Sequence, residues 1–302
     1  MQLLAGVLLA PLLIGLVRRT KALAVGRRGD PLLQVYTDLW KLARKGAVYS
    51  RTTTWVFRAG PVLGLACALV ALALLPMGGA SGLVAFPGDW LLLVGVLALA
   101  RLATILAALD TGSAFEGMGA SREAWFGALA EPALLLCLAG LARAAHSGTL
   151  SGIVAALGPA AWGASSGALA LVGLALFGVL LAENSRIPFD DPATHLELTM
   201  VHEVMVLDHG GPDLAFLELA AALKLWVFAS LLAGVIMPLR TGVAGFDGLA
   251  QLAGIAAIGI ALGVVESTMA RLRLLRVPQL LIGIGVLAIL GVMLASGPGA
   301  PR

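Results

Sequence analysis

Eight long stretches of this sequence carry almost no charge, and this feature limits the possible folds more than any other. A helix needs about 20 mainly apolar residues to cross the roughly 30 Å hydrocarbon core of a bilayer. Each stretch is therefore a candidate membrane-spanning helix. The predicted spans are Leu3 to Val17, Ala59 to Pro76, Trp90 to Leu109, Trp125 to Ala142, Trp162 to Ala182, Asp213 to Pro238, Gly248 to Thr268 and Pro278 to Ala295.

The composition agrees with this interpretation. Hydrophobic residues make up 60% of the chain and charged residues 12%, whereas soluble domains carry about 25% charged residues. A membrane β-barrel is disfavoured because the apolar runs are continuous rather than alternating. The first span is interpreted as a retained anchor, since Arg18, Arg19 and Lys21 follow it instead of preceding it. We predict an all-α integral membrane protein with about eight transmembrane helices in one domain, residues 1–302.

The distribution of basic residues predicts the orientation. Ten Lys and Arg residues fall between Arg18 and Arg58, and loops on the cytoplasmic side retain positive charge. The opposite side holds only Arg143, Arg240 and Arg302. We therefore expect a multi-pass protein of the inner (cytoplasmic) membrane with both termini on the outer side. A nucleic-acid partner is disfavoured, because the basic residues flank membrane spans.

One inward segment, residues 31–45, has the pattern of an amphipathic surface helix. Asp30 is expected to be its N-cap and Pro31 its first helical residue. Apolar residues recur at steps of three and four, with Trp40 and Lys41 among them. Two interpretations remain open: the helix rests on the lipid surface, or a partner subunit covers it.

The other inward segment is a polar loop of about residues 183–212, rich in acids, histidine and proline. Its composition predicts a docking or coupling role. His195 and His202 would share a face of a short helix, but their spacing does not suit a metal site, so proton relay or interface hydrogen bonding is favoured. The candidate residues are Glu183, Asn184, Arg186, Pro188, Asp190, Asp191, His195, Glu197, His202 and Glu203.

Three charged residues, Arg101, Glu131 and Lys224, fall near the centres of predicted spans. A charge at the middle of a membrane helix costs about 2.5–3.5 kcal/mol on insertion scales, so these residues must face one another, a partner or water. We hypothesise a hydrated ion pathway; the alternative is that the charges only pair to hold the helices in place. The pathway candidates are Arg101, Glu123, Glu131, Glu218, Lys224 and Glu266.

The chain shows no active site of its own. Cys67 and Cys137 lie inside apolar spans, whereas an iron–sulfur cluster usually requires four thiolates. No metal site, nucleophile motif or nucleotide-binding loop is apparent. Any redox cofactor is therefore expected in partner subunits, and whether the chain counts as an enzyme stays open.

The polar loop also carries a family resemblance. It reads Glu-Asn-Ser-Arg-Ile-Pro-Phe-Asp-Asp-Pro-Ala-Thr-His-Leu-Glu-Leu-Thr-Met-Val-His-Glu from position 183 to 203. This run resembles the signature of the formate hydrogenlyase subunit 4 family of membrane-bound group 4 nickel–iron hydrogenases, which is homologous to subunit 1 of respiratory complex I. The segment at 112–123 and the run Asp30 to Gln34 also resemble sequences of this family. The continuation Asp191 to His195 favours the hydrogenase branch over the complex I branch.

The resemblance implies a set of partners and a role. The partners would be peripheral hydrogenase-like large and small subunits, which carry the nickel–iron centre and iron–sulfur clusters, antiporter-like membrane subunits, and the lipid bilayer. The role would be to dock the peripheral redox module and couple electron transfer to translocation of protons or sodium. The alternative is a complex I-type NADH–quinone oxidoreductase subunit lining a quinone cavity, and only in that case is a quinone expected. A stand-alone transporter is disfavoured, because no internal repeat is evident.

Overall fold

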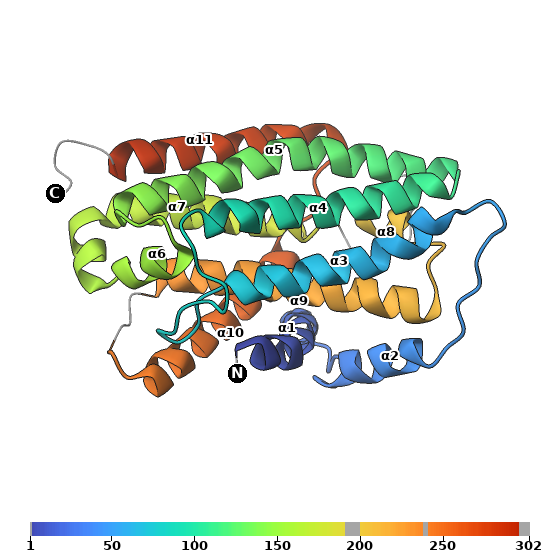
Figure 1. Cartoon of the computed structure of the whole chain (residues 1–302), viewed down its shortest axis with the longest axis horizontal. Helices are drawn as coiled ribbons and strands as arrows, with labels where there is room; N and C mark the ends of the chain where they lie inside the picture. Colours follow the sequence, from blue (N-terminus) through green and yellow to red (C-terminus); the bar gives the residue numbers. More distant parts are fainter. Residues whose placement is uncertain (1, 191–199, 238–240, 296–302) are drawn as a thin grey trace.

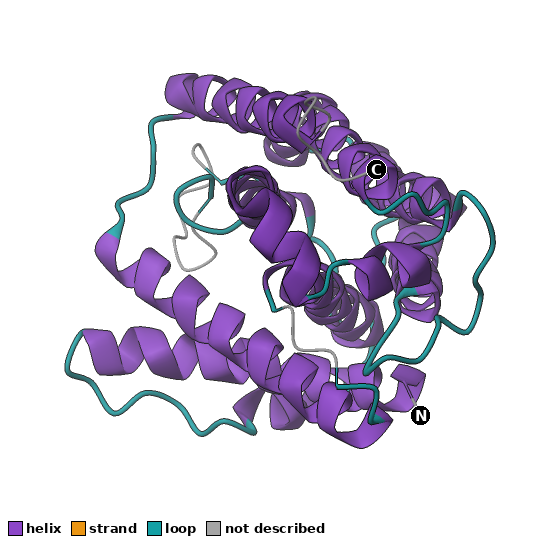
Figure 2. Ribbon diagram, turned by 90° about the vertical axis from the view of Figure 1, so that its left-hand side faces the viewer, coloured by secondary structure: helices purple, strands orange, loops and turns teal. Residues whose placement is uncertain are grey.

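The computed structural model describes residues 2–190, 200–237 and 241–295. These residues form helices joined by loops, with no strand among them (Figures 1 and 2). Eight helices are long and apolar enough to cross a membrane, which confirms the predicted number. They are α1 (Gln2–Ala24), α3 (Trp55–Leu74), α4 (Asp89–Asp110), α5 (Ala114–Ala144), α7 (Pro159–Glu183), α9 (Gly211–Ile236), α10 (Ala244–Thr268) and α11 (Val277–Ala295).

Helix α9 is the centre of the bundle. Of its most apolar segment, 72% is buried inside the protein, the largest share among the eight spans. Helices α1, α3, α7 and α10 all pack against it. A helix that is apolar on every side is typical of such a buried position. Lys224, the single basic residue of α9, is therefore held inside the bundle.

Helices α4, α5 and α11 lie beside one another along the long axis in Figure 1. Helix α5 has 31 residues and begins at Ala114, well before the predicted start at Trp125. The sequence-based boundary was wrong because polar residues of the first turns, such as Glu116 and Glu123, were read as loop. Both side chains are in fact buried in the bundle.

The surface helix exists, as α2 (Gln34–Ala43), but it does not begin where we predicted. Its N-cap is Leu33, which makes no side-chain cap hydrogen bond, and Gln34 N donates to Pro31 O over 2.9 Å in the preceding turn. Asp30 is therefore not the cap. Helix α2 packs on α9 and α1 of its own chain, burying Val35 while Trp40 stays exposed. The lipid surface and a partner subunit both stay open as the neighbour of its outer face.

Two shorter helices complete the described fold. Helix α6 (Leu150–Ala156) precedes α7, and α8 (His202–Met205) precedes α9. Helix α8 belongs to the polar loop of about residues 183–212, which we call the inward loop after its predicted side of the membrane. A 3-10 turn, Leu274–Arg276, leads into α11. The N-terminal end of α3 is held by Asp110 of α4, which accepts hydrogen bonds from Thr54 N at 2.6 Å and from Phe57 N at 3.2 Å.

Candidate functional site: a charge cluster inside the bundle

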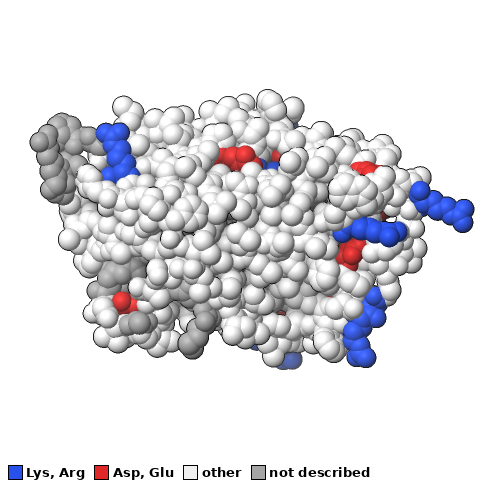
Figure 3. Space-filling model, viewed as in Figure 1, with Lys and Arg blue, Asp and Glu red and all other residues white. Residues whose placement is uncertain are grey.

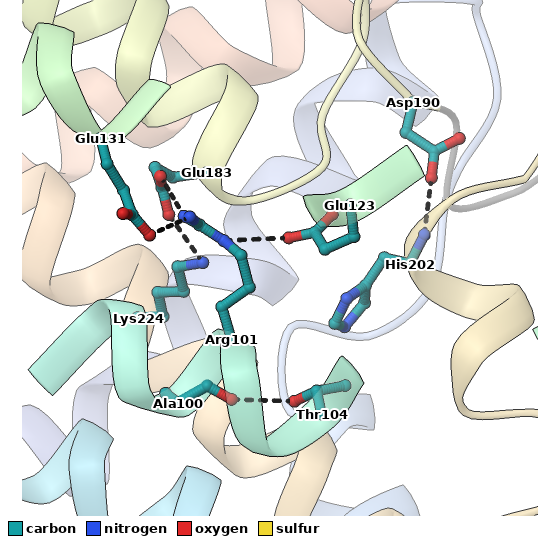
Figure 4. Close-up of polar contacts among 9 residues, drawn as sticks. All are labelled: Ala100, Arg101, Thr104, Glu123, Glu131, Glu183, Asp190, His202 and Lys224. Atoms are coloured by element: carbon teal, nitrogen blue, oxygen red, sulfur yellow. Dashed lines mark hydrogen bonds and ion pairs between the residues drawn. The ribbon is translucent and has the colours of Figure 1, made fainter. Parts of the chain in front are cut away.

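Arg101 of α4 lies at the centre of a charge cluster formed by four membrane-spanning helices (Figure 4). Its Nε lies 3.4 Å from Glu123 Oε1, and its two Nη atoms donate to Glu131 Oε1 and Glu183 Oε1. Lys224 Nζ lies 3.0 Å from Glu183 Oε2. We predicted that Arg101, Glu131 and Lys224 face one another, a partner or water. In the structure Arg101 contacts Glu131 directly, and Glu183 joins Lys224 to Arg101.

Glu183 is placed differently from our prediction. We assigned it to the polar inward loop, but it is the last residue of α7 and its side chain is 1% exposed. Both of its carboxylate oxygens face cations of the cluster. Glu183 directly follows an apolar run, which is compatible with the end of a helix. Its polarity alone could not show whether it ends the helix or begins the loop.

The members of the cluster differ in exposure. The Arg101 side chain is 6% exposed, whereas that of Glu131 is 31% exposed. Figure 3 shows charged groups toward both ends of this face and a small charged patch in its upper middle. Since a carboxylate cannot face hydrocarbon cheaply, the exposed side of Glu131 calls for a polar neighbour or water.

Gly127 of α5 leaves space for the Arg101 side chain. An added Cβ at Gly127 would lie 2.8 Å from Arg101 Cζ and 3.0 Å from its Cδ. Gly127 is four residues from Glu123 and four from Glu131, so the three positions share one face of α5. Our sequence analysis missed Gly127, because nothing in the local pattern distinguishes it from the chain's other packing glycines.

Glu266, the last of the predicted pathway residues, belongs to a second ionic group. It lies on α10, buried, 2.8 Å from Lys21 Nζ of α1 and 3.2 Å from Arg186 Nη1 of the inward loop. Glu218 is exposed on α9 and lines a polar cavity together with Glu266. The predicted pathway thus divides into the Arg101 cluster and this Glu266 group. Lys21 was not among our candidates, since it reads as an ordinary positive flank of the first span.

The described part of the inward loop is folded against the segment that joins α10 to α11. Asp190 lies 2.8 Å from Arg271 Nη2, and its Oδ2 accepts from the backbone N–H groups of Val201 and His202, each at 3.1 Å. Leu272 N donates to Pro188 O over 3.0 Å. The candidates Asp191, His195 and Glu197 lie outside the described residues. Glu203 lines the same cavity as Glu218.

Two adjoining cavities with charged side chains in their walls lie between the cluster and the loop. One, of about 110 Å³, is lined by Arg101, Glu123, Glu183 and Lys224; the other, of about 410 Å³, is lined by Lys21, Glu218 and Glu266. Asn184, Arg186 and His202 line both. A water needs about 10–15 Å³ of such volume, so both spaces have room for several waters. Within the described residues, no group of His, Cys, Asp and Glu has a metal-binding arrangement.

Fold and site together define a polytopic membrane protein with a cluster of charged side chains buried among its spans. The family described as NADH dehydrogenase matches residues 1–296, and this chain belongs to it. The chain is 34% identical to "Formate hydrogenlyase subunit 4" of Escherichia coli (strain K12) over 282 residues, which cover 90% of this chain and 89% of that protein. It is also 34% identical to "Hydrogenase-4 component C" of the same organism over 232 residues, covering 76% and 72% of the two chains.

A solved structure shares the fold. A chain of the membrane-bound sulfane sulfur reductase, described as an archaeal respiratory membrane complex, superposes with a TM-score of 0.80 over 97% of this chain and 96% of that chain. The sequence identity is 22%, so this similarity concerns the fold. The predicted family is confirmed by the family match and the two curated relatives. All three similar proteins are named as parts of multisubunit systems or complexes.

Proposed function

We propose that this chain is the membrane-arm subunit of an energy-converting hydrogenase-type complex. It docks the peripheral redox module through the inward loop and couples electron transfer there to translocation of a proton or a sodium ion. The observation that carries the proposal is the Arg101 cluster. Ionisable side chains are expensive inside a bilayer and mark ion pathways, and here two cations meet three carboxylates inside the spans.

The charge balance of the cluster suits transport. With all groups ionised, one carboxylate is left without a cation. A buried site with one excess negative charge attracts one mobile cation, and a proton on a glutamate satisfies it with no change in the backbone. A redox event that changes the electric field nearby would then load or release that proton. The cluster therefore supports a transport role beyond holding helices together.

The exposed side of Glu131 supports a lateral exit toward a neighbouring subunit. This carboxylate is the most exposed of the three, and α5 carries it near the middle of its length. An antiporter-like membrane subunit that brings a polar group to the same depth would complete the site and accept the ion. Peripheral hydrogenase-like large and small subunits, with their nickel–iron centre and iron–sulfur clusters, would sit on the loop side, with both termini on the outer face of the inner membrane.

The inward loop can act on the cluster through shared cavity walls. Asn184 and Arg186 come within three residues after Glu183 in the chain and line the same cavity as Arg101 and Lys224. Arg186 is also paired with Glu266 of α10. A partner that moves this loop would therefore move charges at the cavity wall.

The test uses the intact complex purified in mild detergent through a tag on this chain. We expect roughly stoichiometric nickel, and in proteoliposomes we expect Lys224→Met to abolish ion translocation while electron transfer continues. The matched control is Lys41→Met, at an exposed lysine of α2. Normal translocation by the Lys224 variant would refute the coupling role, and absence of nickel would refute the hydrogenase assignment.

A second candidate function is favoured by one observation, the pair of adjoining cavities. In a complex I-type NADH–quinone oxidoreductase, this space would receive a quinone headgroup. Inhibition of the purified complex by quinone-site inhibitors, together with absence of nickel, would support that alternative. Insensitivity to these inhibitors in a nickel-containing complex would exclude it.

A further inference from the structure

A third cavity, of about 580 Å³, lies between α7, α9 and α10. These helices meet in the left half of Figure 1, and none of the residues around this cavity lines the two polar cavities. We propose that it is a binding site for one acyl chain of a membrane phospholipid. The proposal is independent of the coupling role, because it involves neither the Arg101 cluster nor the inward loop.

The lining chemistry excludes water and polar ligands. The described lining residues are all apolar or aromatic. The indole N–H of Trp162 is already committed, since it donates to Val235 O over 3.0 Å. Cavities with apolar walls bind apolar molecules in preference to water. Six lining residues lack large side chains and create the space: Ala170, Gly173, Ala233, Gly254, Ala257 and Ala261.

The cavity is placed where a lipid chain can reach it. All of its lining residues lie in membrane-spanning helices, except Met237 at the C-cap of α9. Leu174 is 55% exposed and Ile236 is 44% exposed on its rim, so the cavity opens sideways toward the bilayer. The α9 residues belong to its last turns, which assigns the lipid to the leaflet next to the end of α9.

Its size and shape suit a lipid chain better than a protein helix. One helical turn, 5.4 Å long and about 10–12 Å across, already occupies about 400–600 Å³, which is the whole cavity. A crossing helix has five or more turns, so nearly all of it would lie outside. The lining along α7 extends from Trp162 to Phe177, about 22 Å at 1.5 Å per residue. A long, narrow space of this kind suits an extended hydrocarbon chain.

The test counts bound lipids in the intact complex. Ala170→Phe places a ring in the cavity from α7, and the matched control is Ala164→Phe, at an exposed alanine of the same helix outside the cavity. By native mass spectrometry, we expect the wild type and the Ala164 variant to retain one phospholipid more than the Ala170 variant. Equal numbers in all three would overturn the proposal. Ala257→Phe, which fills the cavity from α10, repeats the test if the first variant fails to assemble.

A second measurement identifies the occupant directly. A phospholipid with a photoreactive group near the end of one acyl chain should label lining residues of α7, α9 and α10 in the wild type, and this labelling should disappear in Ala170→Phe. Labelling of equal strength on the exposed face of α11 would mean that lipid is not bound specifically. Efficient cross-linking of a cysteine at Leu174 to another subunit would mean that a protein covers the cavity. Either result would refute the proposal.

Discussion

Gly127 of α5 lies directly against the guanidinium of Arg101, with space for no more than a hydrogen atom at its Cα. The arginine cannot move away freely, because three carboxylates hold it. The backbone of α5 therefore helps to determine where the central cation of the cluster lies.

Gly127→Ala should displace Arg101 and loosen its ion pairs. Overpacking of this kind costs about 1–3 kcal/mol, so we expect a lower thermal unfolding midpoint and at least a twofold loss in ions moved per electron. Gly117→Ala on the same helix is the control, since an added Cβ at Gly117 meets nothing within 4 Å. Equal unfolding midpoints and equal numbers of ions moved per electron in the two variants would show that the contact between Gly127 and Arg101 has no effect on stability or coupling.

Glu183→Gln should lower the thermal unfolding midpoint more when it is introduced alone than when it is combined with Lys224→Met. Glu183 is almost fully buried and faces both cations, and breaking a buried pair from one side costs about 3–5 kcal/mol because a charge is left uncompensated. Removing Lys224 as well eliminates one of those stranded charges. A double-mutant cycle on unfolding midpoints measures the coupling, and strict additivity would contradict the ion pair.

Glu266→Gln should loosen the described start of the inward loop. Glu266 holds both Lys21 and Arg186, so its loss frees the loop arginine from α10. We expect faster hydrogen exchange of the amides of residues 184–190. Lys21→Met is the comparison variant and should have a smaller effect, because it leaves the Arg186 pair intact. Identical exchange in both variants would argue against the anchoring role.

Stability should fall as the pH is lowered through about 6.5, in part because of His209. This residue lies outside the spans, stacked on Phe57 at 3.9 Å between ring centroids. Burial lowers its pKa below the usual 6.5, although Asp213 and Asp208 oppose the shift. The unfolded chain therefore binds the proton first, and stability present above pH 6.5 is lost as His209 in unfolded molecules becomes protonated.

His209→Phe keeps a stacking ring and removes the titrating group, so it should flatten this pH dependence. Thermal unfolding midpoints from pH 5 to pH 8 provide the measurement. His146→Phe, at an exposed histidine, should keep the pH dependence of the wild type. An unchanged slope in the His209 variant would assign the pH effect to other groups.

Part of the site could be predicted because the cost of a charge in a membrane is a strong and local constraint. Arg101, Glu131 and Lys224 stand out in apolar runs, and the requirement for partners follows from that cost alone. The pairing itself could not be predicted. Glu183 is 82 residues from Arg101 along the chain, and the two meet only because α4 and α7 both pack against α5.

The sequence by itself determined the number of membrane spans and the family, since hydropathy over about 20 residues is a local property and the inward loop carries a long, specific motif. Tertiary structure alone decided where charges meet. It separated Glu266 from the Arg101 cluster, turned the polar start of α5 into buried helix, and placed Gly127 under the guanidinium. The physical reason is that these relationships depend on how helices far apart in the chain pack together, and helical periodicity shows which residues share a face but not which helix that face meets.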